Sequence, residues 1–245
     1  MSCDVFFLSY NEDFADYNYE LLMYKAPQAK RVQGIKGIFN AHKECAKQSN
    51  TEFFYVVDAD AILEDSFHFK YVPDENEEWW PGVPQTSCVH VWRCRNPVNN
   101  LIYGYGGVKL FPKTDILKAK SWNVDFTSST AQVFKAMPEV SNITAFNTDP
   151  FNAWKSAFRE CTKLAAEVIK FRDDKKKVES KTAERLETWC TVGETEPFGE
   201  WAIQGAKLGR QFGTKHKGSK TALNLINDFD WLKEQFIDIY GKENL

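Results

Sequence analysis

Two aspartates separated by one alanine, Asp58 and Asp60, come directly after the apolar run Phe53–Val57. In an extended chain alternate side chains point to the same side, so the two carboxylates would face one way and the alanine the other. Carboxylates at the exit of a buried strand repel each other unless a positive charge lies between them. Mg²⁺ usually binds one or two carboxylates together with phosphate oxygens. The pair therefore predicts a divalent cation that holds a diphosphate, with two solvated turn aspartates as the alternative.

A second copy of the same spacing, Asp228-Phe229-Asp230, occurs late in the sequence. Aspartate is favoured immediately before a helix, where its carboxylate accepts hydrogen bonds from the free N–H groups of the first turn. The run Trp231–Phe236 that follows is typical of a helix, so capping explains this copy. Two aspartates at this spacing are a weak signal by themselves. The apolar strand before Asp58 is what distinguishes the first copy.

The composition excludes several classes of protein. With 43% hydrophobic and 27% charged residues in 245, the chain is too apolar to be disordered. The longest apolar run is Phe53–Val57, far short of the ~20 residues that span a bilayer, and no apolar leader precedes the first strand. We therefore expect a cytoplasmic protein with reduced cysteines, no membrane contact and no obligate protein partner. A net charge of −3 disfavours a general nucleic-acid coat but allows a local basic patch.

Strand and helix patterns alternate through the first part of the chain. Apolar runs predict three buried strands, at residues 3–9, 29–32 and 52–57, and helical spacing predicts helices over 13–24 and 39–48. This order predicts parallel βαβ units with right-handed crossovers. Ligands of such sheets gather at the carboxyl ends of the strands. We therefore expect Ser9–Asn11 and Asp58–Asp60 to share one edge.

The later part of the chain predicts two more strands and then mainly helices. The strands are Val89–Arg95 and Ile102–Phe111, the second kinked by its glycines. Helices are expected to open at Asp149-Pro150 and to cover Glu200–Phe212 and Asp230–Tyr240. No repeat or linker is evident, so we expect one α/β domain over 1–245. Its sheet would be mainly parallel and Rossmann-like, flanked by helices, with a helical C-terminal part.

Segments along nearly the whole chain resemble a known family. The order of CDVFFLSYNE, RVQGIKGIFNAH and EFFYVVDADAIL resembles a GT-A glycosyltransferase half-domain, which binds nucleotide sugars. The segments YGYGGVKLFPK, SNITAFNTDPFNAWKSAFREC and INDFDWL resemble small glycosyltransferases of tailed bacteriophages, some of which glycosylate 5-hydroxymethylcytosine in DNA. Of these motifs, only the paired aspartates are a family-wide GT-A signature.

The resemblance implies a GT-A-like fold and sugar transfer from a UDP-sugar, with Mn²⁺ or Mg²⁺ as the metal. It implies DNA as a partner, with hydroxymethylcytosine as the acceptor. Three alternatives stay open: a glycosyltransferase acting on a protein, glycan or lipid, a nucleotidyltransferase, and a nucleotide- or DNA-binding module without turnover. Under the resemblance, residues 1–65 would be the nucleotide-binding half and 66–245 the acceptor-side half.

The resemblance places the donor contacts in the first half. The segment after the first strand, Ser9, Tyr10 and Asn11, would face the nucleoside. Asn40 or His42, near the start of the second helix, would reach the ribose or a phosphate. A helix cap explains Asn40 equally well, and His42 could simply lie along the helix flank.

The resemblance also implies a set of metal ligands. Asp58 would contact the ribose or the metal, and Asp60 the metal directly. GT-A enzymes often add a metal-binding histidine late in the chain, and His216 is the candidate of that type in this sequence. Because it lies between Lys215 and Lys217, a solvated basic loop is an equal alternative.

A glycine-rich segment is a candidate for the acceptor side. Around Gly104, Gly106 and Gly107 the backbone could approach the donor sugar or the acceptor closely, with Tyr103 or Tyr105 as a wall. A bulge or a tight bend explains the glycines equally well.

Asp149 could be the general base that deprotonates the acceptor hydroxyl. The order Asp-Pro is also preferred for a helix cap followed by the first helical residue. Four other aspartates remain rivals for the base: Asp115, Asp125, Asp228 and Asp230.

A basic block could contact a nucleic acid. No Asp or Glu occurs between Trp201 and Asn227, whereas five cations do: Lys207, Arg210, Lys215, Lys217 and Lys220. Such a block could follow DNA phosphates, or it could be a solvated face balanced by the acidic stretch Glu187–Glu200. Three tryptophans in loop-like surroundings could stack on a flipped base or pack in the core: Trp79, Trp80 and Trp122.

Overall fold

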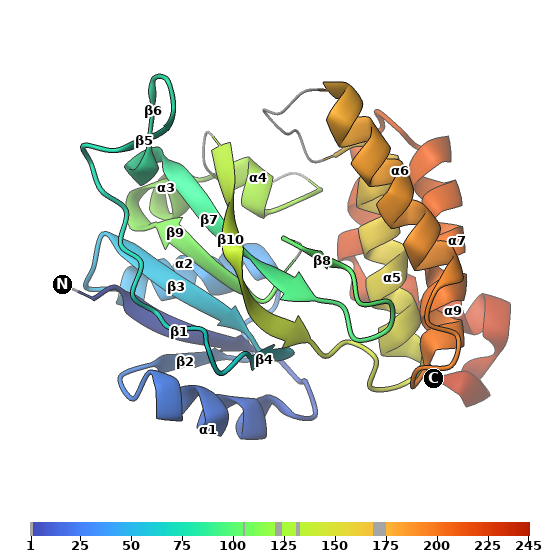
Figure 1. Ribbon diagram of the computed structural model, residues 1–245. Coiled ribbons are helices and arrows are strands. Elements are labelled where there is room, and N and C mark those ends of the chain that lie inside the picture. The colour runs from blue at the N-terminus through green and yellow to red at the C-terminus, as the bar shows by residue number, and fades with distance from the viewer. Residues whose placement is uncertain (1, 105, 121–123, 131–132, 169–174) are drawn as a thin grey trace. The chain divides into compact units, whose positions relative to one another are not determined.

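The computed structural model describes residues 2–104, 106–120, 124–130, 133–168 and 175–245 (Figure 1). The chain divides into two compact units. The first comprises Met1–Arg95, Ile102–Trp122 and Phe126–Thr144, and the second comprises Asn96–Leu101, Asn123–Asp125 and Ala145–Leu245. The boundary expected at residue 65 lies inside the first unit, so these units differ from the expected halves. A single domain stays a prediction.

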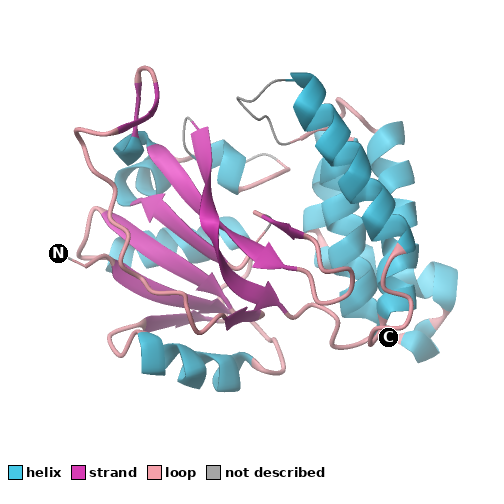
Figure 2. Cartoon of the chain, in the orientation of Figure 1, coloured by secondary structure: helices cyan, strands magenta, loops and turns pink. Residues whose placement is uncertain are grey.

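A sheet of eight strands forms the basis of the first unit (Figure 2). The strands are β1 (Asp4–Ser9), β2 (Lys30–Gln33), β3 (Phe53–Asp58), β4 (Ala61–Leu63), β7 (Cys88–Arg95), β8 (Ile102–Tyr103), β9 (Val108–Pro112) and β10 (Val133–Thr144). Their spatial order is β2-β1-β3-β9-β7-β10-β4, and β8 pairs with β7. Strands β1, β2, β3, β7 and β10 run in one direction, whereas β4, β8 and β9 run against them. This mainly parallel sheet confirms the predicted α/β class.

Helices cover both faces of the sheet. The helix α1 (Ala15–Lys25) lies on one face, and α2 (Ile38–Gln48), α3 (Lys113–Lys118) and the segment leading into α4 (Thr127–Thr130) lie on the other. Phe7 and Tyr55 pack with Leu22 of α1, whereas their neighbours Phe6 and Phe54 pack against α2 and α3. Because both faces are covered, β1 and β3 are continuous apolar runs rather than alternating ones.

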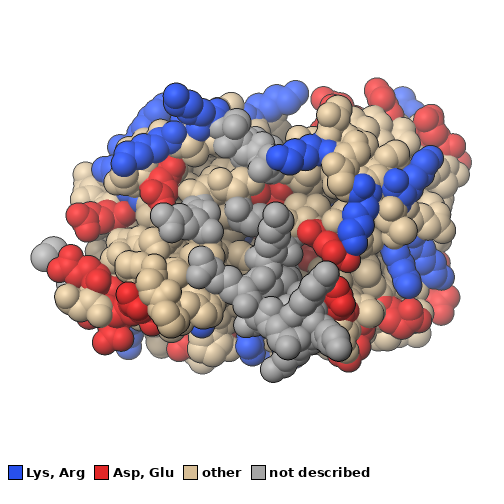
Figure 3. All heavy atoms as spheres, turned by 90° about the horizontal axis from the view of Figure 1, so that it is seen from above, with Lys and Arg blue, Asp and Glu red and all other residues tan. Residues whose placement is uncertain are grey.

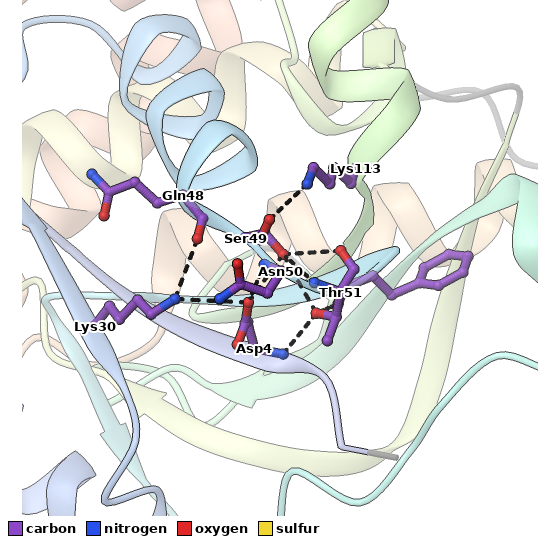
Figure 4. Close-up of polar contacts among 8 residues, drawn as sticks. Asp4, Lys30, Gln48, Ser49, Asn50, Thr51 and Lys113 are labelled. Atoms are coloured by element: carbon purple, nitrogen blue, oxygen red, sulfur yellow. Dashed lines mark hydrogen bonds and ion pairs between the residues drawn. The ribbon is translucent and has the colours of Figure 1, made fainter.

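The turn between α2 and β3 is fixed by lysines and a carboxylate (Figure 4). Lys30 donates to the Gln48 carbonyl at 3.2 Å, and Lys113 donates to the Ser49 carbonyl at 2.6 Å. These carbonyls end the helix and need donors from outside it. The Ser49 hydroxyl also donates to the Asp4 carboxylate at 3.4 Å. The start of β3 is thereby fixed, and with it the residue at which the strand emerges on the opposite edge.

A hairpin of β5 (Glu78–Trp80) and β6 (Val83–Pro84) leads through the short helix η1 (Gln85–Ser87) into β7. The ammonium of Lys135 lies 4.4 Å from the Trp79 ring centroid and 4.9 Å from that of Trp80. The indole of Trp79 donates to His90 Nε2 at 3.0 Å. Since Lys135 pairs with His90 near the starts of β10 and β7, both tryptophans lie at the amino edge of the sheet.

The second unit is helical, which confirms the predicted helical C-terminal part. Its helices are α5 (Pro150–Ala165), α6 (Lys175–Thr191), α7 (Gly199–Lys215), α8 (Lys220–Asn224), η2 (Leu225–Asn227), α9 (Phe229–Tyr240) and η3 (Lys242–Asn244). Three glycines of α7 face backbone carbonyls of α5, at Trp154, Phe158 and Thr162: they are Gly205, Gly209 and Gly213. A Cβ atom at any of them would collide with α5, so this close packing requires glycine.

One predicted strand is wrong. The expected single strand over Ile102–Phe111 is two strands, β8 and β9, each antiparallel to β7. The backbone of Gly107 has a φ of +84°, which an extended strand does not adopt. The glycines therefore break the strand rather than kink it.

Candidate functional site

The carboxyl edge of the sheet brings together the two segments predicted to share it. Leu8 of β1 is the register partner of Asp58 in β3, and Ser9 pairs with Gln33 of β2. Both strands have their carboxyl ends here, and the antiparallel β9 begins at the same edge with Val108, which follows Gly107. We call Asp58, Asp60, Gly107 and Lys109 the carboxyl-edge cluster.

Asp58 is held by a cation and a backbone N–H group. Lys109 donates from Nζ to Asp58 Oδ2 at 2.8 Å, and Gly107 donates to the same oxygen at 3.2 Å. Burial would raise the pKa of Asp58, but the Lys109 ammonium beside it holds that pKa below its usual value. Lys109 is 8% exposed and the Asp58 side chain is 29% exposed, so the lysine end of the ion pair is the shielded one. Asp58 therefore stays ionised at neutral pH.

Asp60 is in a different electrostatic situation, because no ion pair reaches it from the residues that the structure describes. Burial, then the charge of Asp58 and then that of Glu12 raise the pKa of Asp60 to about 7. The cluster thus holds one carboxylate balanced by lysine and one whose ionisation is unfavourable. A divalent cation at this edge would relieve that cost.

The donor atoms of the cluster fit a hard cation. The described part of the chain contains no group of three or more His, Cys, Asp or Glu side chains suited to a metal. A cation here would therefore take Asp58 and Asp60 as its carboxylate ligands and oxygens from a bound ligand for the rest. Lys109 and Gly107 contact only Oδ2 of Asp58, which leaves Oδ1 for a metal. Such a set fits Mg²⁺ or Mn²⁺ held with phosphate rather than zinc.

Gly107 connects the cluster to β10. Its carbonyl accepts the Asp58 N–H at 2.9 Å, and a Cβ on it would collide with the Asn142 side-chain amide. Asn142 is buried, and its amide donates to the Thr144 hydroxyl at 3.0 Å. The tight bend considered for these glycines is thus formed at Gly107. Apart from its chain neighbours, no residue that the structure describes lies within 4 Å of the position that a Cβ on Gly106 would take.

The predicted nucleoside segment is accessible except for its first residue. Ser9 is buried, and its hydroxyl accepts from Arg31 Nε at 2.9 Å. Tyr10 is 47% exposed and Asn11 is exposed. Arg31, which also forms an ion pair with Asp16, is a residue of this edge that the sequence did not single out. The pattern KRVQ around Arg31 does not indicate its contacts with Ser9 and Asp16.

The two helix residues predicted to reach the donor have different surroundings. Asn40 is exposed on α2, and its amide donates to the Lys36 carbonyl at 3.5 Å. His42 is fully buried, with its ring against Phe111 and Phe126, and burial lowers its pKa to about 4. In this conformation its imidazole is neutral and has no surface that a nucleotide could touch. The role of His42 at the donor stays a prediction.

The predicted acceptor wall is only partly visible. Tyr103 ends β8 and is buried, with its carbonyl close to the Cys94 thiol. Tyr105 and Trp122 lie outside the described residues. Trp79 and Trp80 lie at the amino edge of the sheet, away from the carboxyl ends where Asp58 emerges. Their contacts with Lys135 make them part of the hairpin packing.

Aspartates of the second unit mainly cap helices. Asp149 Oδ1 accepts the Asn152 N–H at 2.6 Å, and Asp228 Oδ1 accepts from the N–H groups of Asp230 and Trp231, both at 3.1 Å. Capping by the second aspartate pair is therefore confirmed. Asp125 lies 3.7 Å from Lys163 in an ion pair.

Asp115, the remaining rival for the base, belongs to the first unit. It lies in the first turn of α3, and burial raises its pKa.

Four of the five cations of the basic block form an ion pair or line a cavity. Lys217 pairs with Glu167 at 2.6 Å. His216 follows α7 and packs on the Phe212 ring, with centroids 4.5 Å apart. Three others line a cavity of about 660 Å³ in the second unit: Lys207, Arg210 and Lys215.

Comparison with known proteins gives structural neighbours alone. No protein-family model and no curated protein matches the sequence. Among solved structures, the mannosyltransferase PcManGT of Pyrobaculum calidifontis, solved with GDP-Man and Mn²⁺, is similar over 100% of this chain and 84% of its own, at 12% identity and a TM-score of 0.43. HddC of Yersinia pseudotuberculosis is similar over 56% of this chain and 69% of its own, at 17% identity and a TM-score of 0.33. At these scores neither neighbour supports an assignment of function.

None of the helices that the structure describes is both long and apolar enough to cross a bilayer.

Proposed function

We propose that this chain is a metal-dependent glycosyltransferase that moves a sugar from a UDP-sugar to an acceptor hydroxyl. The observation that carries the proposal is the pair Asp58 and Asp60 at the carboxyl edge of a mainly parallel sheet, where nucleotide ligands of α/β proteins bind. Lys109 balances the negative charge of Asp58, and a bound cation would be needed to stabilise the ionised form of Asp60. A divalent cation shared with a diphosphate would stabilise such a pair.

The residues of the edge would divide the donor between them. Asp60 and Oδ1 of Asp58 would hold Mn²⁺ or Mg²⁺, and the bound cation would neutralise charge on the departing nucleoside diphosphate. Lys109 keeps Asp58 ionised and adds a positive charge beside it. Tyr10, whose ring is partly exposed, and Asn11 would contact the nucleoside. Ser9 would act through its hydrogen bond with Arg31.

Three further residues remain proposals without a contact that supports them: Asn40 and His42 for the ribose or phosphate, and His216 for the metal.

We favour the hydroxyl of 5-hydroxymethylcytosine in phage DNA as the acceptor, on the sequence resemblance and the basic residues of α7. Lys and Arg side chains form separate groups with Asp and Glu between them on the face shown in Figure 3. A local DNA contact therefore fits this surface better than a broad basic coat. Transfer to a protein, glycan or lipid hydroxyl is the rival within the same reaction class.

Asp149 is our candidate for the base. Its carboxylate is engaged in the cap of α5, where Asn152 donates to both oxygens. Because asparagine caps helices about as well as aspartate, Asp149→Asn separates the two roles. If Asp149 is the base, transfer falls ~100-fold or more while the melting temperature stays unchanged. Unchanged transfer would leave Asp149 with capping alone.

The deciding experiment pairs the two aspartate copies. Asp60→Asn is tested against Asp230→Asn, the equivalent change in the second copy, by calorimetric titration with Mn²⁺ and UDP and by transfer from a panel of nucleotide sugars. Products are identified from nucleoside masses of hydroxymethylated and plain DNA. We expect Asp60→Asn to lose Mn²⁺ binding and transfer and Asp230→Asn to keep Mn²⁺ binding. Full transfer by Asp60→Asn would overturn the metal site.

The same assay separates the rival functions. Turnover on a protein, glycan or lipid acceptor with no mass gain on any DNA would overturn the DNA acceptor and keep the glycosyltransferase. DNA binding without turnover of any donor would indicate a binding module. Release of pyrophosphate from nucleoside triphosphates would indicate a nucleotidyltransferase.

A further inference from the structure

The helix α7 has two chemically different faces. Gly205, Gly209 and Gly213, four residues apart, face α5. A second set of residues lies at helical spacings of three, four, seven and eight from the first, which places them together on the other side: Lys207, Arg210, Gln211, Thr214 and Lys215. The glycine contacts fix α7 against α5, and this polar face is therefore presented in a defined direction.

The polar face lines a cavity of about 660 Å³ whose other wall is α6. The residues from α6 are Glu187, Cys190 and Thr191, all inside the second unit. Cys190 is the buried side chain in this lining, and the other side chains end in charges, hydroxyls or an amide. We call these eight lining residues the α6–α7 groove.

Positive charge in the groove is only weakly compensated. Among the described residues, Lys207 and Lys215 form no ion pair. Arg210 lies 3.4 Å from Glu187, with side chains 49% and 66% exposed. An ion pair so open to water contributes little to the stability of the fold. An incoming anion could therefore displace Glu187 from Arg210 at little cost.

The spacing of the cations indicates a ligand with several phosphates. Lys207 and Lys215 are eight residues apart on one helix, which at ~1.5 Å per residue separates them by about 12 Å along the axis. Phosphates repeated along a strand match this separation. A nucleic-acid strand rises roughly 3.4 Å per nucleotide, so three or four nucleotides would cover the distance. The Gln211 amide could then donate to a phosphate or sugar oxygen, whereas the hydroxyls of Thr191 and Thr214 donate to the Glu187 and Arg210 carbonyls at 2.7 and 2.8 Å.

We propose that the α6–α7 groove binds the sugar-phosphate backbone of one strand of a DNA acceptor. This inference rests on the proposed DNA acceptor and assigns its phosphate contacts to three of the cations of the basic block. Lys207 and Lys215 hold the two ends of the segment, and Arg210 exchanges Glu187 for a phosphate between them. The contacts read no base, so the groove positions a strand without selecting its sequence.

The test measures binding of a short fluorescent single-stranded oligonucleotide containing 5-hydroxymethylcytosine, by anisotropy over a range of salt concentrations. The variants are Lys207→Gln and Lys215→Gln, with Lys233→Gln as the matched control, because Lys233 is an exposed lysine on α9 of the same unit. Each groove variant should bind roughly fivefold more weakly near 0.1 M salt and lower the log–log salt slope by ~0.7, since one phosphate contact is lost. The control should change neither. Melting temperatures confirm that all three variants fold.

A further variant tests whether a phosphate replaces Glu187 at Arg210. Glu187→Gln removes the competing acid, so binding of the oligonucleotide should become tighter, roughly twofold to fivefold if one phosphate contact is strengthened. Equal affinity of wild type, Lys207→Gln and Lys215→Gln would overturn the proposal. So would losses of the same size in Lys233→Gln.

Two further measurements are needed. The first distinguishes a DNA strand from a small phosphate compound as the ligand, and the second distinguishes failure of this inference from failure of the proposed activity. Inorganic phosphate and UDP are titrated as competitors, and displacement of the oligonucleotide by either at micromolar concentration would overturn a strand as the ligand. Binding is repeated in the Asp60→Asn background, where we expect it to be unchanged. Lysine-dependent binding there, without transfer by the wild type, would support the groove and reject only the activity.

Discussion

The two Asp-x-Asp copies have identical spacing but different structural surroundings. At Asp58 and Asp60 the chain leaves a strand that is buried on both faces. Asp58 forms an ion pair with the buried Lys109, and the charge of Asp58 helps to raise the pKa of Asp60. At Asp228 and Asp230 the chain enters a helix from solvent, and Asp228 accepts two N–H groups of the first turn. The same two side chains thus make a charged edge in one place and a cap in the other.

The difference lies in what compensates the negative charge. Backbone N–H groups satisfy Asp228 locally, within three residues of sequence. Asp58 needs Lys109, 51 residues away, and Asp60 has no such partner among the residues described. The chemistry of this short motif therefore depends on the charged residues that the fold brings close to it. Changing the charge at one copy at a time tests this difference.

The largest contrast should come from pH. Mn²⁺ needs the ionised carboxylate, and the pKa of Asp60 is raised to about 7. Affinity for Mn²⁺ should be constant above pH 7 and fall about tenfold for each unit below it, roughly a hundredfold by pH 5. Titration calorimetry of the wild type at several pH values measures this. A flat profile between pH 7 and pH 5 would show that Asp60 is not a ligand.

Removing the lysine should have the next largest effect. Lys109→Met leaves the partly buried Asp58 carboxylate without a counter-charge, which should lower the free energy of unfolding by ~2 kcal/mol. Lys47→Met is the matched control, because Lys47 and Glu44 form a solvent-exposed pair whose loss should change the stability little. Urea denaturation compares the two. Equal losses would mean that Lys109 contributes only an ordinary surface ion pair.

Asp60→Asn should stabilise the metal-free protein. Burial and Asp58 raise the pKa of Asp60 from 3.8 to about 7, so the folded state binds this proton more tightly than the unfolded state. The wild type therefore loses stability as the pH rises from about 4 to about 7, and asparagine removes that loss. At pH 8 without metal we expect Asp60→Asn to melt a few degrees higher. Added Mn²⁺ should stabilise the wild type and leave the variant unchanged.

The smallest effect belongs to the second copy. Asp228→Ala removes the cap of α9 and should cost ~1 kcal/mol, or about 2–4 °C in melting temperature for a chain of this size. Asp228→Asn should be nearly neutral, because asparagine also caps. Mn²⁺ binding should be unaffected in both variants. A change in metal affinity in either variant would give the second copy a functional role.

The strands of the first unit could be predicted from the sequence because they are apolar on both faces. Phe6 and Phe54 face one core, and Phe7 and Tyr55 face the other. Continuous apolar strands followed by polar residues predict both the parallel order and the edge. The burial of His42 could also have been predicted, since Ala41, His42, Cys45 and Ala46 form one buried face of α2. The pattern of the helix outweighs the chemistry of the side chain.

Other features had no local signal. Lys109 resembles any strand lysine until β9 is paired with β3, and Asn142 gains its role only by packing on Gly107. The strand β10 was missed because its register shifts after Met137 and again after Val140, which interrupts the alternation. The helix α6 was missed because its first turns are charged. Long-range pairing decides these positions, and the sequence alone does not contain it in readable form.

The glycines of α7 also restrict how this helix can vary. Each residue turns the helix by about 100°, so one residue inserted between Gly205 and Gly209 would bring different side chains against α5 from that point onward. Lys215 would then turn away from the groove together with Gly213 from its contact at Thr162. Substitutions on the polar face leave the packing of α7 on α5 unchanged, whereas insertions and deletions in this helix disrupt it. Homologous chains should therefore keep the length of α7 even where they have lost its charges.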